Sequence, residues 1–253
     1  MRFVLVETSR PGNIGATARA MKTMGFSDLV LVRPRFVDVA TQPEAIAFAS
    51  GAVDILQQAR RVESIGEALA GCNFAAAVSA RLREFSPPVT TPRELAARLA
   101  LHADTRIALV FGNERFGLPN EIVEKCNVLI NIPANPAYSS LNLAQAVQIV
   151  AYEMAMGGHQ FADLTPNAGG GGAQSVGVRT AAGFRGQTAP LDGIEAMYTH
   201  LEEALIAIEF LDPAHPKKLM ARLRRLFART QLETEEVNIL RGIAKHILQT
   251  RRP

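Results

Sequence analysis

Two hydrophobic patterns alternate along the first two-thirds of the chain. Short runs rich in Val, Ile, Leu and Phe, typical of buried strands, are followed by stretches in which apolar residues recur every three or four positions, as in helices. The runs predict strands at Phe3–Glu7, Leu29–Arg33, Phe74–Ser79, Ile107–Phe111 and Asn127–Ile132, with a weaker one at Arg61–Glu63. Helices are expected at Asn13–Met24, Pro43–Arg60, Ser64–Ala70, Pro92–His102, Pro119–Lys125 and Ser140–Met156. This alternation predicts an α/β fold around a parallel sheet.

The remainder of the chain has a different composition. Residues 158–190 contain Gly169–Gly172 in a row and few apolar residues. They predict a flexible linker that couples its neighbours only loosely. Helical periodicity then returns at Leu191–Leu211, Pro216–Thr230 and Glu233–Gln249. The pattern divides the chain into an α/β domain (1–157), a glycine-rich linker (158–190) and a small all-α extension (191–253).

Composition and charge narrow the classes of function. The chain of 253 residues is 48% hydrophobic and 20% charged, as in ordinary globular proteins. Its net charge of +3 permits a nucleic-acid partner without establishing one. Cys72 and Cys126 are too few for a disulfide framework and are not spaced as a metal site. With no signal pattern and no apolar run of membrane-spanning length, we expect a cytoplasmic protein without a membrane span or a bound metal.

The first candidate site is the loop ETSRPGNIGATARAM after the first strand, because ligands bind beyond the carboxyl ends of strands in an open parallel sheet. Gly15 allows close approach of a backbone, and the helix N-terminus favours an anion. Asn13 fits this role and that of a plain helix cap equally well. Arg19 lies off the apolar stripe of its helix, where a solvated arginine is the default interpretation.

The second candidate is FGNERFGL, directly after the strand IALVF. Gly112 and Gly117 allow a sharp turn close to a ligand. Glu114 and Arg115 fit a ligand site, but they also fit a local ion pair of little energetic value. The segment is neither a P-loop nor a dinucleotide-binding motif.

The third candidate, NPAYSSLN, crowds Ser139, Ser140 and Asn142 at the start of a helix that needs only one cap. The surplus polarity indicates a loop that also holds a ligand, while Ser139 alone fits a plain cap.

Together, NIGATARA, FGNERFGL and SSLNLAQA resemble the three motifs of the SpoU (TrmH-like) branch of the SPOUT RNA methyltransferases. In addition, HPKKLMARLRRLFART and EEVNILRGI resemble the helical C-terminal extension of the J group of bacterial tRNA 2′-O-methyltransferases. The resemblance implies a deep trefoil knot, an exceptional feature among folds. It also implies S-adenosylmethionine bound in the knot and a homodimer whose active site is shared between subunits. The implied reaction is methylation of a tRNA ribose, at a cytidine or uridine in position 32 of the anticodon loop.

The resemblance also implies individual roles. Arg19, Asn13 and Glu114 match catalytic positions. Arginine does not readily lose its proton, so we expect Arg19 to act electrostatically, with Asn13 and Glu114 holding its guanidinium. Contacts with the cofactor are implied for Ser79, Ala80, Arg81, Gly112, Gly117, Ile132, Ser140, Leu141 and Asn142. Two departures, the absence of any Trp and the glycine-rich linker, concern the substrate more than the chemistry.

Helical spacing in the extension places Lys218, Arg222, Arg225 and Arg229 on one face, beside an apolar face with Leu219, Leu223, Leu226 and Phe227. Alone this is a solvated basic face, but next to an RNA-modifying domain it predicts contacts with phosphates. Three alternatives stay open: an rRNA substrate, a catalytically silent RNA-binding paralogue, and an enzyme acting on a small nucleotide. Intact Asn13, Arg19 and Asn142 disfavour the silent paralogue, and the basic face disfavours the small substrate.

Overall fold

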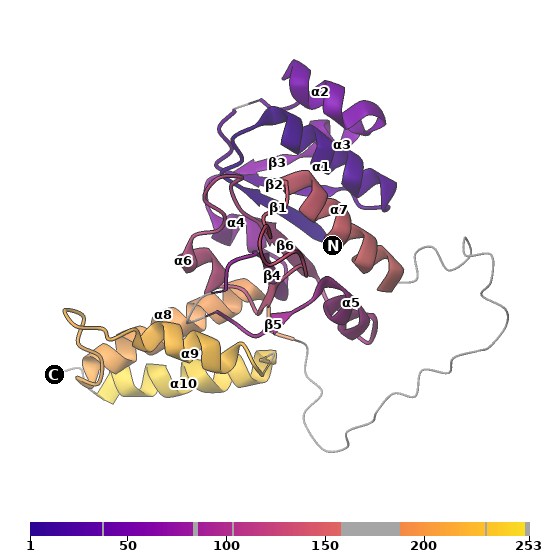
Figure 1. Ribbon diagram of the computed structural model, residues 1–253. Helices are drawn as coiled ribbons and strands as arrows, with labels where there is room; N and C mark the ends of the chain where they lie inside the picture. Colours follow the sequence, from indigo (N-terminus) through magenta and orange to yellow (C-terminus); the bar gives the residue numbers. More distant parts are fainter. Residues whose placement is uncertain (37, 83–85, 103, 158–187, 231, 251–253) are drawn as a thin grey trace, which may run out of the picture.

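The computed structural model describes residues 1–36, 38–82, 86–102, 104–157, 188–230 and 232–250 (Figure 1). Within these residues one seven-stranded sheet has the order β3-β2-β1-β6-β4-β7-β5, and every neighbouring pair is parallel. The strands are β1 (Arg2–Val6), β2 (Asp28–Val32), β3 (Arg60–Val62), β4 (Phe74–Val78), β5 (Val89–Thr90), β6 (Ile107–Phe111) and β7 (Val128–Ile130). The predicted α/β fold with a parallel sheet is therefore confirmed.

Helices cover both faces of the sheet. One face carries α1 (Pro11–Thr23), α2 (Pro43–Ala49), α3 (Val53–Gln58), α5 (Pro92–Ala100) and α7 (Leu143–Gly157), and the other α4 (Ile65–Leu69) and α6 (Asn120–Val123). Side chains of β1 alternate between the two cores, with Phe3 and Leu5 in the first and Val4 and Val6 in the second. This is the two-residue period of a strand that is buried on both sides.

Two predicted helices differ from the structure for local reasons, and one strand is additional. The helix expected at Pro43–Arg60 is divided into α2, the 3₁₀ turn η1 (Ser50–Ala52) and α3, because Ser50 adopts a φ of 53°. The helix expected from Pro216 begins only at Leu219, because Lys217 and Lys218 have φ values of 43° and 59°. A left-handed residue cannot continue a right-handed helix. Strand β5 was not predicted, since two residues are too short to show a period.

The extension consists of α8 (Leu191–Ala207), α9 (Leu219–Phe227) and α10 (Thr234–Thr250) (Figure 1). The three helices enclose a small core around Met197 and Val237. Most of the predicted linker, residues 158–187, lies outside the described residues. The expectation of loose coupling is wrong where the chain re-enters the fold. Leu191 is only 6% exposed and packs into the second core with Leu69, and its amide donates to the carbonyl of Cys72 at 2.9 Å.

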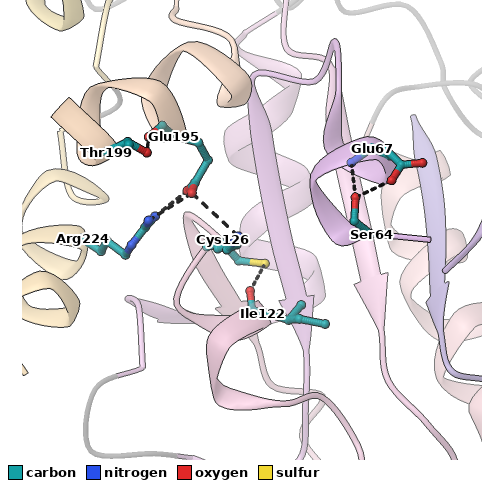
Figure 2. Close-up of polar contacts among 8 residues, drawn as sticks. Ser64, Glu67, Ile122, Cys126, Glu195, Thr199 and Arg224 are labelled. Atoms are coloured by element: carbon teal, nitrogen blue, oxygen red, sulfur yellow. Dashed lines mark hydrogen bonds and ion pairs between the residues drawn. The ribbon is translucent and has the colours of Figure 1, made fainter. Parts of the chain in front are cut away.

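Charged side chains reinforce this junction. Glu195 on α8 accepts two hydrogen bonds from the guanidinium of Arg224 on α9 (Figure 2), and the Nζ atom of Lys125, which follows α6, lies 3.8 Å from the Glu195 carboxylate. The Arg224 guanidinium also lies 4.3 Å from the centre of the Tyr198 ring. Arg224 therefore serves packing within the extension and is separate from the exposed basic face of α9.

Gly15 explains how closely α1 and α2 pack. A Cβ atom at this position would lie 2.1 Å from the carbonyl oxygen of Ala45, far inside van der Waals contact. The close approach that the sequence indicates at Gly15 is therefore made by a neighbouring helix and not by a ligand.

We expect Gly15→Ala to lower the free energy of unfolding by about 1–3 kcal/mol, because the helices must separate to admit the methyl group. The control is Gly242→Ala in α10, where an added Cβ meets no atom within 4 Å and Ala is favoured by about 0.5–1 kcal/mol. Urea denaturation measures both variants. Equal free energies of unfolding for the two would contradict the packing role of Gly15.

Candidate active site

A cavity of about 370 Å³ opens beyond the carboxyl ends of β4, β6 and β7. Its wall is formed by the residues that follow these strands and by the residues that precede α7. Eight residues predicted to contact a cofactor line it: Ser79, Ala80, Arg81, Gly112, Gly117, Ile132, Ser140 and Leu141. The fold thus brings three loops that are distant in sequence to one cavity, at the edge of the sheet where ligands bind in such folds.

The sequence indicates a ligand contact for Asn142 and a helix cap for Ser139, and the structure shows the reverse arrangement. Asn142 does not line the cavity but caps α7, since its Oδ1 accepts from the amides of Ala144 at 2.9 Å and Gln145 at 3.4 Å. Ser139, which could have been a plain cap, lines the cavity instead. The helix therefore starts at Leu143, three residues later than expected, and Ser139 and Ser140 remain available to a ligand.

Glu114 joins the second loop to the first. Its Oε2 accepts from the amide and hydroxyl of Ser9, both at 2.9 Å, and its Oε1 accepts from the Arg10 amide at 3.3 Å and Asn13 Nδ2 at 2.9 Å. Asn13 Oδ1 in turn accepts from Asn142 Nδ2 at 3.0 Å. One network thus connects all three motifs, and the carboxylate holds the start of α1 rather than an ion pair with Arg115.

The environment of Glu114 keeps it ionised. Partial burial raises the pKa of the carboxyl, but the hydrogen bonds donated by Asn13 and Ser9 outweigh it and leave the pKa below its ordinary value. At neutral pH the group is a carboxylate that only accepts hydrogen bonds. It is therefore suited to fixing donors in place and not to giving a proton to a substrate.

Arg19 lies apart from this network. It is exposed on α1, and it does not line the cavity. In the structure the Glu114 oxygens accept from Ser9, Arg10 and Asn13, so the expectation that Asn13 and Glu114 hold the Arg19 guanidinium stays a prediction.

Sequence reasoning missed three asparagine and serine side chains that shape the loops. Asn113 Nδ2 donates to the Glu7 carbonyl at 2.5 Å, and Asn131 Nδ2 donates to the carbonyls of Ser79 and Ala80 at 3.1 and 3.3 Å. The third is Ser9, described above. Each is a small polar residue within three positions of the end of a buried strand, which was a usable signal, but their partners depend on the order of strands in the sheet.

The described part of the chain gives little support for a cysteine nucleophile, a metal site or a membrane span. Burial raises the pKa of Cys72, and it raises the pKa of Cys126 to about 12, so neither is a ready nucleophile. The described residues contain no cluster of His, Cys, Asp and Glu that could hold a metal ion. Within the same residues, no helix is long and apolar enough to cross a membrane.

The four cations predicted to bind RNA, Lys218, Arg222, Arg225 and Arg229, are all exposed along α9 and its two ends. The apolar face beside them is smaller than predicted. Phe227 packs against the core of the extension, whereas Leu226 is exposed.

Comparison with known proteins identifies both parts of the chain. Residues 1–152 match the SpoU rRNA Methylase family, and residues 192–253 match the family described as tRNA methyltransferase TrmJ, C-terminal domain. The chain is 45% identical to the tRNA (cytidine/uridine-2′-O-)-methyltransferase TrmJ of Pectobacterium atrosepticum, over 99% of this chain and 97% of that protein. It is 45% identical to the TrmJ protein of Salmonella choleraesuis, over 98% and 96% of the two chains.

Solved structures agree with this assignment. The crystal structure of TrmJ from Z. mobilis ZM4 superposes with a TM-score of 0.79 at 33% identity, covering 98% of both chains. A putative methylase family protein from Neisseria gonorrhoeae superposes with a TM-score of 0.61 at 37% identity, covering 79% of this chain and 92% of that one. The chain therefore belongs to the SpoU methylase family and carries the C-terminal domain of its TrmJ members.

Proposed function

We propose that this protein is an S-adenosylmethionine-dependent tRNA methyltransferase that modifies the ribose 2′-hydroxyl of a cytidine or uridine at position 32. The observation that carries the proposal is the network from Glu114 through Asn13 to Asn142, which unites the three family motifs beside one cavity. The proposal is supported by relatives that match nearly the whole chain and are named for 2′-O-methylation of cytidine or uridine in tRNA.

The cavity suits the proposed cofactor. Its volume of about 370 Å³ lies within the range of roughly 300–1,000 Å³ found for small-molecule sites. Ser79, Ser139 and Ser140 line the cavity together with apolar Ile132 and Leu141, a combination that can hold a molecule with polar and flat parts. When bound, S-adenosylmethionine supplies an electrophilic methyl group on a positively charged sulfur.

The protein's own part in the reaction is alignment and charge. Arg19 stabilises the negative charge that develops on the ribose 2′-oxygen, while the hydroxyl proton leaves to the adjacent phosphate or to water. Its planar guanidinium can contact that phosphate at the same time. Asn13 and Glu114 position the first turn of α1, and hence the helix that carries Arg19. They are positioning residues in this scheme.

Further features belong to the same proposal. The exposed position of Arg19, away from its own chain's cavity, supports a homodimer in which Arg19 of one subunit serves the cavity of the other. By resemblance to the family, a trefoil knot around the cavity and a cytoplasmic location belong to the same proposal.

Incubation with labelled donor and total RNA, followed by nucleoside mapping, tests the function. Label in rRNA alone would favour the rRNA alternative, and donor binding without transfer would favour a silent paralogue.

We expect Arg19→Ala to abolish methyl transfer while the dissociation constant for the donor changes only a few-fold. Arg19→Lys should recover little activity, because a point charge cannot reproduce the planar fork. Lys22→Ala, three residues further along α1, is the control for loss of an exposed cation. Single-turnover rates and calorimetry measure the two effects. Near-normal transfer by Arg19→Ala would remove the residue from the mechanism.

Mixed dimers test the shared site. Arg19→Ala lacks the proposed activating group, and Ser140→Trp fills the cavity with a ring, so each variant alone should be inactive. In a mixed dimer with shared sites, both defects fall in one site and the other site is intact, so co-refolded mixtures should recover up to about a quarter of wild-type activity if subunits pair at random. Activity that stays at the background of the separate variants would show that each site is built from one chain.

The basic face of α9 is tested by charge reversal. Arg222→Glu should weaken tRNA binding and reduce the slope of log affinity against log salt by about 1, because fewer counterions are released. Lys245→Glu on α10 changes the net charge equally and is expected to have a much smaller effect. Filter binding across a salt series measures both. The same slope in both variants would identify the face as merely solvated.

A further inference from the structure

An aromatic ring stands exposed at the rim of the cavity. Phe116 lines the cavity, yet its side chain is 75% exposed. A second ring, Tyr138, directly precedes the cavity-lining Ser139 and is 80% exposed. Exposed apolar groups gathered at a cavity are typical of surfaces that contact a ligand. The exposed Phe116 ring therefore forms an apolar part of the cavity lining.

The loop that carries Phe116 is held in one conformation. Asn113 and Gly117 exchange backbone hydrogen bonds of 3.1 and 2.8 Å, and Asn113 Oδ1 accepts from the amides of Arg115 and Phe116 at 2.8 and 3.3 Å. Gly117 has a φ of 70°, and a Cβ at Gly112 would lie 2.2 Å from the Gly117 backbone. The ring is thus presented to solvent by a fixed turn, which lowers the entropy lost when a partner binds.

Positive charge accompanies the ring. The guanidinium of Arg115 lies 5.2 Å from the centre of the Phe116 ring, and Arg81 lines the same cavity from the loop after β4. Both arginines are exposed. A flat aromatic face beside arginines is the combination with which proteins bind unpaired nucleotides, through stacking on the base and contacts with phosphate. A purely apolar subunit contact would not need this charge.

We propose that Phe116 is the stacking platform for the base of the nucleotide that is methylated, with Arg115 contacting a neighbouring phosphate. The inference rests on the proposed function, which places an unpaired nucleotide of the anticodon loop at this cavity. Glu114, the residue before Arg115, belongs to the network that positions α1. The platform therefore adjoins the groups that position the reaction.

Substitutions at Phe116 separate stacking from simple apolar contact. Phe116→Ala should raise both the KM and the dissociation constant for tRNA by roughly 5- to 100-fold, the range expected from loss of one stacked base. Phe116→Trp should stay close to wild type, whereas Phe116→Leu should resemble the Ala variant because it keeps volume without an aromatic face. The matched control is Phe48→Ala on α2, a ring that is 54% exposed and does not line the cavity.

Three measurements on the full-length chain decide the outcome. Equilibrium binding of tRNA is measured beside turnover, so the platform is tested even if the wild-type chain transfers no methyl group, a result that would overturn only the proposed function. Donor affinity that falls with Phe116→Ala would assign the ring to the cofactor. Dissociation of the dimer in Phe116→Asp would assign it to the subunit interface. Binding of tRNA by Phe116→Leu as tight as that of the wild type would also overturn the proposal.

Discussion

The geometry of the site depends on the carboxylate of Glu114 and the hydrogen bonds that it accepts. Its two oxygens accept from Ser9, Arg10 and Asn13, and Asn13 connects onward to the cap of α7. Loops more than 100 residues apart in sequence thereby form one unit. The hydrogen bonds lower the pKa of Glu114 despite its partial burial, so the acceptor remains charged when it is needed. Removing that charge would leave several donors without their acceptor at once.

The sheet determines why these loops meet. β1 and β6 are adjacent although more than 100 residues separate them, and β4 and β7 lie on the far side of β6. Their carboxyl ends therefore open on the same edge of the sheet, with Gly112 tight against Gly117 and Asn131 tied to the loop after β4. Side chains that are far apart in the sequence therefore line one cavity, because the order of the strands places the loops that carry them side by side.

Local patterns predicted what depends on local physics. The runs around Phe3 and Ile107 have the period and length of buried strands, and the structure contains both. The crowding of Ser140 beside Asn142 indicated more than a cap, but only the folded structure shows that Asn142 is the cap and that Ser140 lines the cavity. The partners of Gly15 and Leu191 could not be predicted, because each residue contacts an element far away in the sequence, and local patterns do not show which distant elements meet.

The docking of the extension has a consequence for the size and shape of a substrate that contacts both parts of the protein. Leu191 is inserted into the core of the α/β domain, and Glu195 ties α9 to the same junction. The distance between the exposed cations of α9 and the cavity is thus set by this packing and not by the length of the segment that joins the two parts. A polyanion that reaches both must match that dimension. Under the proposed function, this fixed distance selects RNA by the spacing between the two parts of the molecule that the extension and the cavity contact.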